Sequence, residues 1–347
     1  MSNRAALVES PKGEVVVRDT EVFEPEPGEV QIKVHACTVQ PIDAKIGRLG
    51  MMPMEYPTIL GSQVAGVVTA VGAQVTNVAV GDRVVGTTKV VAQKKAKFGG
   101  LQRFSILDAS GLVEIGDVDF VKSTTLAPTT PPAVLFADST LKLHRPTIPP
   151  SPLPANEQGK KVLIWGGSSS TGSLSIVYAK LAGYTVISTS SPRNFDLLKA
   201  CGADYIFDHS DPATINAIRD LFPIDYWLDT ISLQPSITSI FKILAPDGKS
   251  LVTANILVLL PPSMIGVTNI PEGVTLQAHR FATAAPENAE WHKYFLARGG
   301  YLEQAIKNDL LKTVPADVLG GLEKVSDAFD LLLKGVSARK IVIEPWT

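Results

Sequence analysis

Cysteine is scarce in this chain of 347 residues, and histidine is only slightly more common. With only Cys37 and Cys201 present, neither a disulfide framework nor a zinc cluster of four cysteines can form. The five histidines include no pair four residues apart, the spacing that places two ligands on one face of a helix. The sequence therefore contains no recognisable metal-binding motif.

Long apolar segments and an excess of one charge are also missing. The best apolar stretch, residues 254–260, ends at two prolines and is much shorter than the ~18 residues of a membrane span. Residues 1–17 have no apolar core long enough for a signal peptide. The 32 basic and 34 acidic residues leave a net charge of -2, which offers no electrostatic footprint for nucleic acid or an anionic membrane. We expect a soluble, cytoplasmic protein, either a monomer or a homodimer.

The length suits two globular domains, and the pattern of the first part is rich in strands. Hydrophobic residues make up 45% and charged residues 19% of the chain, which excludes a disordered or fibrous protein. Within the first ~125 residues, short β-branched runs alternate with turns, as in a compact antiparallel or barrel-like domain. The strands expected there are residues 14–17, 29–34, 63–71 and 83–85.

After a proline-rich stretch at residues 145–158, the pattern changes to strands alternating with helices. Such repeated units predict a doubly wound parallel sheet. The expected strands are 162–165, 185–189, 204–207, 225–230 and 250–255, with helices at 173–181, 195–200, 215–221 and 237–244. A strand at 274–279, helices around 287–297 and 325–333, and a strand at 340–344 follow. The proline-rich stretch is either a domain linker or a loop inside one domain.

The segment from Gly166 to Gly172 joins a continuous apolar strand directly to a helix. Glycines let a backbone turn tightly and approach a pyrophosphate, which the N–H groups of the helix N-terminus then bind. The serine and threonine hydroxyls of this turn are additional donors. The spacing departs from G-x-G-x-x-G, so a purely structural turn is the alternative, but the strand-turn-helix context favours a dinucleotide site.

The end of the second strand of this alternating part, residues 188–194, indicates which dinucleotide binds. NAD-binding units usually carry an acidic residue there, which accepts a hydrogen bond from the ribose 2′-hydroxyl. Here the segment reads Ser-Thr-Ser-Ser-Pro-Arg-Asn and has no carboxylate. Hydroxyls and a guanidinium suit a 2′-phosphate, so the sequence favours NADPH, although Arg193 in an ordinary polar loop is the alternative.

Over essentially its whole length, the chain resembles the medium-chain dehydrogenase/reductase superfamily. The resemblance rests on residues 27–45, 60–86, 159–172 and 338–344, in that order. It implies an α/β protein with two domains. A GroES-like, β-rich catalytic domain is formed by residues 1–125 and completed by 281–347. A Rossmann-type NADPH-binding domain, with a doubly wound parallel sheet, is formed by residues 126–280.

Two residues stand where zinc-dependent alcohol dehydrogenases of this superfamily have metal ligands. Gln40 occupies the position of a cysteine, and Ser62 occupies that of the histidine in a Gly-His-Glu motif. Glutamine and serine are poor zinc ligands, and a catalytic zinc site needs three protein ligands. The four-cysteine structural zinc lobe is missing as well. The resemblance therefore implies an enzyme without zinc.

Residues 40–45, Gln-Pro-Ile-Asp-Ala-Lys, resemble the N-P-x-D-x-K signature of the zinc-free quinone and enoyl reductases. The turn at 165–172 and the loop at 188–194 are most similar to fungal trans-acting enoyl reductases. Those enzymes use NADPH to reduce an α,β-unsaturated thioester on the acyl carrier of a separate polyketide synthase. The implied reaction is hydride transfer to the β-carbon of such a thioester. A stand-alone quinone or enone oxidoreductase and a non-catalytic NADPH-binding protein are the alternatives.

The resemblance also assigns roles to individual residues. Lys45 and Thr130 are the implied catalytic residues, Lys45 lying near the nicotinamide ribose; a solvated helix lysine and a helix-start threonine are the alternatives. The implied cofactor-binding set is Pro41, Ile42, Asp43, Lys45, Gly166, Gly167, Ser168, Ser169, Ser170, Thr171, Ser190, Ser191, Arg193, Asn194, His209, Thr253, Val336 and Ser337. The implied substrate set is Met51, Phe104, Thr129, Thr130, Phe136 and Gln277; Met52 and Phe98 fit the same apolar lining, although such a set also fits plain core.

Overall fold

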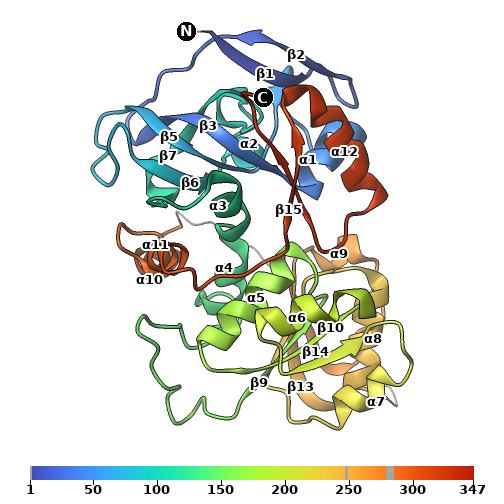
Figure 1. The fold of residues 1–347 in the computed structure, drawn as a ribbon. Coiled ribbons are helices and arrows are strands. Elements are labelled where there is room, and N and C mark those ends of the chain that lie inside the picture. Colours follow the sequence, from blue (N-terminus) through green and yellow to red (C-terminus); the bar gives the residue numbers. More distant parts are fainter. Residues whose placement is uncertain (1, 247–248, 279–284) are drawn as a thin grey trace. The chain divides into compact units, whose positions relative to one another are not determined.

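The computed structural model describes residues 2–246, 249–278 and 285–347, which form two compact units (Figure 1). Unit 1 comprises Met1–Pro128, His292–Leu310 and Pro315–Thr347. Unit 2 comprises Thr129–Trp291 together with Leu311–Val314. Within the described part of the chain, no helix is long and apolar enough to span a membrane.

Unit 1 is built from two sheets of short strands. The larger sheet has the order β15-β16-β3-β5-β6-β8, with β7 also paired to β3, and only the β15-β16 pair is parallel. Its strands are β3 (Glu29–Val39), β5 (Gln63–Val71), β6 (Arg83–Thr87), β7 (Phe104–Asp108), β8 (Leu112–Glu114), β15 (Ala316–Gly320) and β16 (Lys340–Ile343). The smaller sheet contains β1 (Asn3–Val8), β2 (Val15–Thr20) and β4 (Thr58–Ile59). The predicted β-rich, antiparallel character is confirmed.

The helices of unit 1 pack around these sheets. They are α1 (Pro41–Leu49), α2 (Val90–Gln93), α3 (Phe120–Leu126), α11 (Tyr301–Lys307) and α12 (Val325–Lys334), while α10 (Ala289–Phe295) spans the boundary between the units. Pro41 occupies the first turn of α1, and Gly50 ends that helix with a φ of 60°. Helices α1 and α12 pack against each other. The approach is so close at Gly47 that an added Cβ atom would lie 2.7 Å from the Phe329 ring. The C-terminal helix thereby fixes the position of α1.

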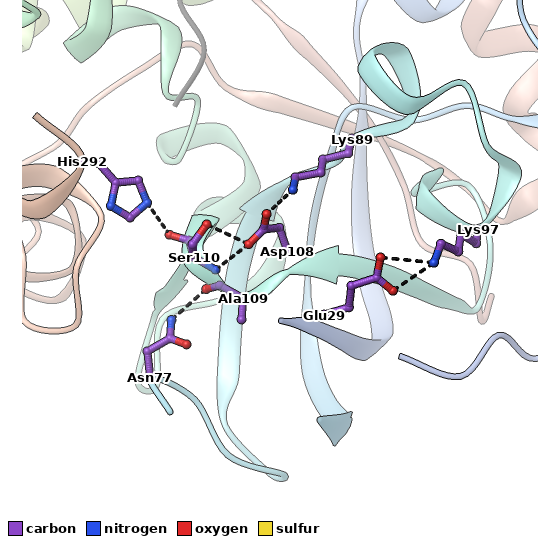
Figure 2. A network of polar contacts seen from close by, with 8 residues as sticks. All are labelled: Glu29, Asn77, Lys89, Lys97, Asp108, Ala109, Ser110 and His292. Carbon is purple, nitrogen blue, oxygen red and sulfur yellow. Dashed lines mark hydrogen bonds and ion pairs between the residues drawn. The ribbon is translucent and has the colours of Figure 1, made fainter. Parts of the chain in front are cut away.

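A polar network ties the segment after unit 2 to the strands of unit 1 (Figure 2). His292 on α10 donates from Nε2 to the carbonyl of Ser110, at 2.8 Å. The amide and hydroxyl of Ser110 both donate to Asp108, whose carboxylate also pairs with Lys89. The polypeptide thus returns to unit 1 at a point 182 residues away in sequence.

Unit 2 contains one parallel sheet in the order β11-β10-β9-β12-β13-β14. The first strand of this unit lies at the centre, with the second and third on one side and the rest on the other, which is the doubly wound arrangement predicted from the sequence. The strands are β9 (Lys161–Trp165), β10 (Thr185–Ser190), β11 (Tyr205–Asp208), β12 (Tyr226–Asp229), β13 (Lys249–Val258) and β14 (Glu272–Ala278). The helices are α4 (Thr130–Phe136), α5 (Ser170–Leu181), α6 (Phe195–Cys201), α7 (Thr214–Arg219), α8 (Gln234–Leu244) and α9 (Pro262–Ile265).

The predicted strands of unit 2 are observed with ends shifted by up to three residues, and the last two strands differ most. The strand expected at 250–255 continues to Val258, because Ile256, Leu257 and Val258 are fully buried and pair with β12 and β14. The strand expected at 274–279 is observed as Glu272–Ala278, and position 279 lies outside the described residues.

The proline-rich stretch at 145–158 is a loop within unit 2 and not a linker. Its end is fixed by Glu157, whose Oε2 atom accepts hydrogen bonds from the hydroxyls of Tyr184 at 2.7 Å and Tyr226 at 2.8 Å. Lys160 donates to the other carboxylate oxygen at 2.6 Å. Because Tyr226 begins β12 and Tyr184 directly precedes β10, Glu157 fastens the loop to the amino-terminal edge of the sheet.

Candidate functional site

The turn between β9 and α5 is constrained on all sides by its own unit. Gly166 has a φ of 82°, and a Cβ atom at Gly172 would lie 2.3 Å from the carbonyl oxygen of Gly166. The amide of Gly166 donates to Thr189 Oγ1 at 3.1 Å, and that of Gly167 donates to the carbonyl of Thr189 at 2.9 Å. Glycine is required here because the strand must turn sharply and the helix must begin at once. These two amides serve the turn and are not available to a ligand.

The N-terminus of α5 offers the donors that an anion needs. Ser169 is the N-cap residue, and its Oγ atom accepts a hydrogen bond from the amide of Gly172 at 2.9 Å. The amides of Ser170 and Thr171 occupy the first turn, where no intrahelical acceptor exists. Together with the positive end of the helix dipole, they suit a pyrophosphate. The residues present therefore fit a dinucleotide cofactor.

The carboxyl ends of β10 and β11 bring several predicted residues together. Ser191 Oγ lies 3.2 Å from Nε2 of His209, although the two residues are 18 positions apart. Ser190 is buried, Arg193 is exposed, and Asn194 is buried at the start of the following helix. A guanidinium, an imidazole and hydroxyls thus gather at the edge where a parallel sheet binds its ligand.

A carboxylate also lies at this edge, and the sequence pattern did not reveal it. Asp208 ends β11 and pairs in register with Ser190. Its Oδ1 atom accepts hydrogen bonds from the hydroxyl of Ser210 at 2.6 Å and from the amide of Ser210 at 2.9 Å. These hydrogen bonds lower the pKa of Asp208. The Asp208 carboxylate accepts hydrogen bonds within its own turn. Arg193 is then the cationic group of this segment that suits a phosphate.

In unit 1, the start of α1 is organised around Asp43, whose side chain is fully buried. One carboxylate oxygen accepts from the amide of Gln40 at 2.8 Å, and the other accepts from the amide of Gly61 at 3.1 Å. Ser62 donates its hydroxyl to both oxygens. Burial raises the pKa of Asp43 to about 6, against the opposing effect of these hydrogen bonds. The side chain of Asp43 therefore holds α1 against the Gly61–Ser62 turn from inside the unit.

Lys45 follows on the same helix and is half-buried. Among the described residues, its ammonium group has no hydrogen-bond or ion-pair partner. Pro41 is exposed, while Ile42 packs partly against the core of unit 1. Lys45 is thus a cation with a restricted side chain whose donors are not used by the residues described.

The predicted threonines and the C-terminal pair lie at the ends of elements. Thr129 and Thr130, both half-buried, begin α4 in unit 2, and no side-chain hydrogen bond caps that helix. Val336 and Ser337 lie between α12 and β16 in unit 1, with Val336 packed partly against the core and Ser337 exposed.

Several residues assigned to substrate contact are packed in the interior of a unit. Phe136 is 1% exposed and meets Tyr178 edge to face, and Phe104 is 6% exposed and meets Trp346 in the same way. Phe98 is 5% exposed. These three rings therefore pack in the interior, where burial of an aromatic side chain contributes to the stability of the fold. Met51 is 38% exposed and Met52 is partly buried.

Thr253 and Gln277 lie on the last two strands of the parallel sheet. Thr253, one of the predicted cofactor-binding residues, lies within β13 (Lys249–Val258). Strand β13 continues to Val258, and its pairing with β12 begins only at Ile256. Thr253 is exposed and precedes the part of β13 that pairs with β12. Gln277 donates from Nε2 to the carbonyl of Ser139 at 2.6 Å and accepts from Asn255.

Known proteins with similar sequences match nearly the whole chain. Residues 26–117 match the alcohol dehydrogenase GroES-like domain family, and residues 170–293 match the zinc-binding dehydrogenase family. The dehydrogenase azaJ of Aspergillus niger is 31% identical over 353 residues, covering 99% of each protein. The chain belongs to the medium-chain dehydrogenase/reductase superfamily.

Two further similarities concern the sequence and the fold. The trans-enoyl reductase himH of Aspergillus japonicus is 31% identical over 91% of this chain and 89% of that protein. The crystal structure of CurK enoyl reductase superposes with a TM-score of 0.74, covering 99% of each chain at 18% identity, which establishes a common fold. A medium-chain dehydrogenase/reductase is an oxidoreductase that uses a nicotinamide cofactor, in agreement with the donors found at α5.

Membership in this superfamily makes the position of Ser62 informative, because the zinc-dependent enzymes have a metal ligand there. Ser62, which stands at a ligand position of the zinc enzymes, is committed to Asp43. Across the described residues, no three His, Cys, Asp or Glu side chains come together as a metal site would require.

Thr189 and Thr230, both near the ends of strands adjacent to β9, were not among the predicted residues. Each contacts the turn through its side-chain hydroxyl. The only sequence signal for these two residues is a threonine near the carboxyl end of a strand that pairs with β9.

Proposed function

We propose that this protein is an NADPH-dependent enoyl reductase that acts without zinc on an α,β-unsaturated thioester. The observation that carries the proposal is the hydrogen bonding between Ser62 and Asp43. A zinc alcohol dehydrogenase needs an imidazole and a thiolate at the positions of Ser62 and Gln40. In this protein Ser62 helps to hold helix α1 through Asp43, and Gln40 carries a neutral amide. Reduction of a C=C bond conjugated to a carbonyl needs no such ligands.

The cofactor would be held by residues of unit 2. The amides of Ser170 and Thr171, with hydroxyls of the same turn, bind the pyrophosphate. Arg193 and His209 bind the 2′-phosphate at the ends of β10 and β11. When bound, the reduced nicotinamide supplies the hydride for the β-carbon of the substrate.

Lys45 has the chemistry that the rest of the reaction requires. Negative charge develops on the thioester oxygen as the β-carbon is reduced, and a positioned cation stabilises it. An ammonium group also donates to ribose hydroxyls or supplies a proton toward the α-carbon. Thr130, at the start of α4, adds a hydroxyl donor for the carbonyl.

The substrate we propose is a thioester carried by the acyl carrier domain of a separate polyketide synthase. Support comes from the similarity to a protein named trans-enoyl reductase over nine-tenths of the chain. A cytoplasmic location agrees with this role.

The decisive experiment compares three substrates with the purified protein, following the absorbance of NADPH. These are an enoyl thioester on an acyl carrier protein, the same enoyl group on N-acetylcysteamine, and a simple enone. We expect oxidation of NADPH with both thioesters and a higher kcat/KM for the carrier-bound one. Equal or better turnover of the free enone would instead indicate a stand-alone enone reductase. Binding of NADPH without turnover of any substrate would indicate a non-catalytic protein.

A further inference from the structure

Thr230 follows the last residue of β12 and is 7% exposed. Its Oγ1 atom lies 2.8 Å from the carbonyl oxygen of Trp165 and 3.0 Å from that of Gly166. The same atom lies 2.9 Å from Oγ of Ser169, the N-cap residue of α5. One hydroxyl thus contacts the end of β9, the glycine turn and the N-cap residue of the helix.

The chemistry of the partners fixes the direction of every hydrogen bond in this group. Carbonyl oxygens only accept, so the hydroxyl hydrogen of Thr230 is directed to Trp165 and Gly166. Ser169 must then donate to Thr230. Because Ser169 also accepts from the amide of Gly172 at 2.9 Å, a single chain runs from Gly172 through Ser169 and Thr230 to the carbonyls. Ser169 thus donates once and accepts once, while Thr230 accepts from Ser169 and shares its one hydroxyl hydrogen between the two carbonyls.

The loop that carries Thr230 is itself held firmly. The carboxylate of Asp229 accepts from the amide of Ile231 at 2.9 Å and from Ser236 Oγ at 2.6 Å. Ser232 adopts a φ of 52°, and its hydroxyl donates to the carbonyl of Asp229 at 2.9 Å and accepts from the amide of Leu259 at 2.6 Å. A residue other than glycine rarely takes such a φ unless the surroundings impose it. The ends of β12 and β13 therefore hold Thr230 in place.

We propose that Thr230 is a positioning residue that shapes the phosphate-binding turn through Ser169. The hydroxyl hydrogen of Ser169 is consumed inside the protein, so Ser169 acts as a cap and not as a donor to the cofactor. The donors left for a pyrophosphate are those of Ser168, Ser170 and Thr171, whose hydroxyls have no partner among the residues described. This assignment rests on the proposed use of NADPH. It distinguishes Ser169 from the other three hydroxyl residues of the turn, all of which the resemblance assigns to the cofactor.

The test uses the full-length protein with Thr230→Val, Thr230→Ser, Ser169→Ala and the double variant of Thr230→Val with Ser169→Ala. Thr140→Val is the matched control, because Thr140 also donates to backbone carbonyls of unit 2, at 2.7 Å and 3.0 Å, and does not contact the turn. Two quantities are measured: the Kd for NADPH by fluorescence titration, and hydrogen exchange at the amide of Gly172 without cofactor. Melting temperature is recorded for each protein.

We expect Thr230→Val and Ser169→Ala each to raise the Kd about tenfold, which corresponds to about 1.4 kcal/mol, and to speed exchange at Gly172. The double variant should be little worse than either single one, because both changes break the same chain. Thr230→Ser should restore binding to within about twofold and Thr140→Val should leave it unchanged, since the first keeps the hydroxyl and the second lies elsewhere.

A wild-type Kd and slow exchange in Thr230→Val would overturn the proposal, as would a lower melting temperature without a change in Kd. If Thr230→Val fails to fold, Ser169→Ala decides the question by the same two measurements. Wild-type protein that binds no NADPH would count against the proposed function, while exchange at Gly172 in the variants would still show whether the hydrogen-bond chain exists.

Discussion

Ser62 donates its hydroxyl to both carboxylate oxygens of Asp43, at 2.9 Å and 2.8 Å. Both residues are buried, and the pair joins the Gly61–Ser62 turn to the first turn of α1. A position that binds metal in the zinc enzymes of this superfamily is thus part of a structural hydrogen-bond cluster. The same hydrogen bonds therefore bear on two properties, the stability of unit 1 and its capacity to bind a metal.

The first prediction is that the purified protein contains no stoichiometric zinc. Ser62 is held by Asp43 and Gln40 carries a neutral amide, so neither supplies a strong ligand. Elemental analysis should find well under one zinc per chain, and a chelator should leave enone or thioester reduction unchanged. One tightly held zinc per chain, lost together with activity, would contradict this expectation.

The second prediction is that Asp43→Asn lowers the free energy of unfolding by about 1–3 kcal/mol. An asparagine keeps one acceptor oxygen for Gly61 and Ser62, but its NH2 group faces the amide of Gln40, where two donors meet. Urea denaturation measures the change. Asp330→Asn is the control, because that carboxylate is exposed and pairs with Arg48 at the surface, where an ion pair contributes little. Equal stability losses in the two variants would show that the buried cluster has no special role.

The third prediction concerns the choice of cofactor. Arg193 is exposed and follows Ser191, which contacts His209, by two residues, and Asp208 accepts hydrogen bonds from Ser210. NADPH should therefore bind at least ~10-fold more tightly than NADH, a difference of about 1.4 kcal/mol. Arg193→Ala should remove most of this difference in a fluorescence titration.

The control for that titration is Lys199→Ala, which removes an exposed cation on α6 that pairs with Asp196. It should keep the preference for NADPH. Equal affinities for the two dinucleotides in the wild-type protein would refute the assignment of this edge to a 2′-phosphate.

The fourth prediction concerns Lys340, which is buried on β16 and donates only to the carbonyl of Thr125, at 3.4 Å, among the described residues. Burial lowers the pKa of Lys340 to about 7 from the ordinary 10.5. Between these values the unfolded chain holds a proton that the folded protein lacks, so stability rises with pH across this window. Lys340→Met should remove a slope of about 1.4 kcal/mol per pH unit.

Urea denaturation at about pH 7, 8 and 9 measures that slope. Other titrating groups contribute equally to both proteins, so the difference between wild type and Lys340→Met isolates one lysine. Lys334→Met, at the exposed end of α12, should keep the wild-type slope. Parallel curves for wild type and Lys340→Met would show that Lys340 remains charged in the folded protein.

The sequence predicted the parallel sheet and the glycine turn because both follow from local patterns. Apolar runs of strand length alternate with helical periodicity from residue 161 onward, and glycines mark the turn. The position of Asp208 beside Ser190 could not be predicted in this way, because it depends on which strands pair and in what register.

The same reason applies to other contacts between distant segments. Thr230 and Ser169 are 61 residues apart, and only the folded sheet brings their hydroxyls together. The resemblance assigns Phe136 to the substrate set, and its contact with Tyr178, where α4 packs on α5, is a second fact that only the folded unit supplies. Contacts between distant segments decide such positions, and local propensity does not report them.

The last prediction tests the proposed role of Lys45. This residue lies one turn into α1, which Asp43 anchors at its start and Gly50 ends. Lys45→Ser should lower kcat/KM for the enoyl thioester by roughly 10²-fold, as expected for loss of a positioned donor. The melting temperature should change little, because the lysine head has no partner among the described residues that folding would need. Lys242→Ser, on the exposed side of α8, should retain full activity. Wild-type turnover in Lys45→Ser would instead assign this lysine to solvent, and the proton and the charge stabilisation would have to come from another group.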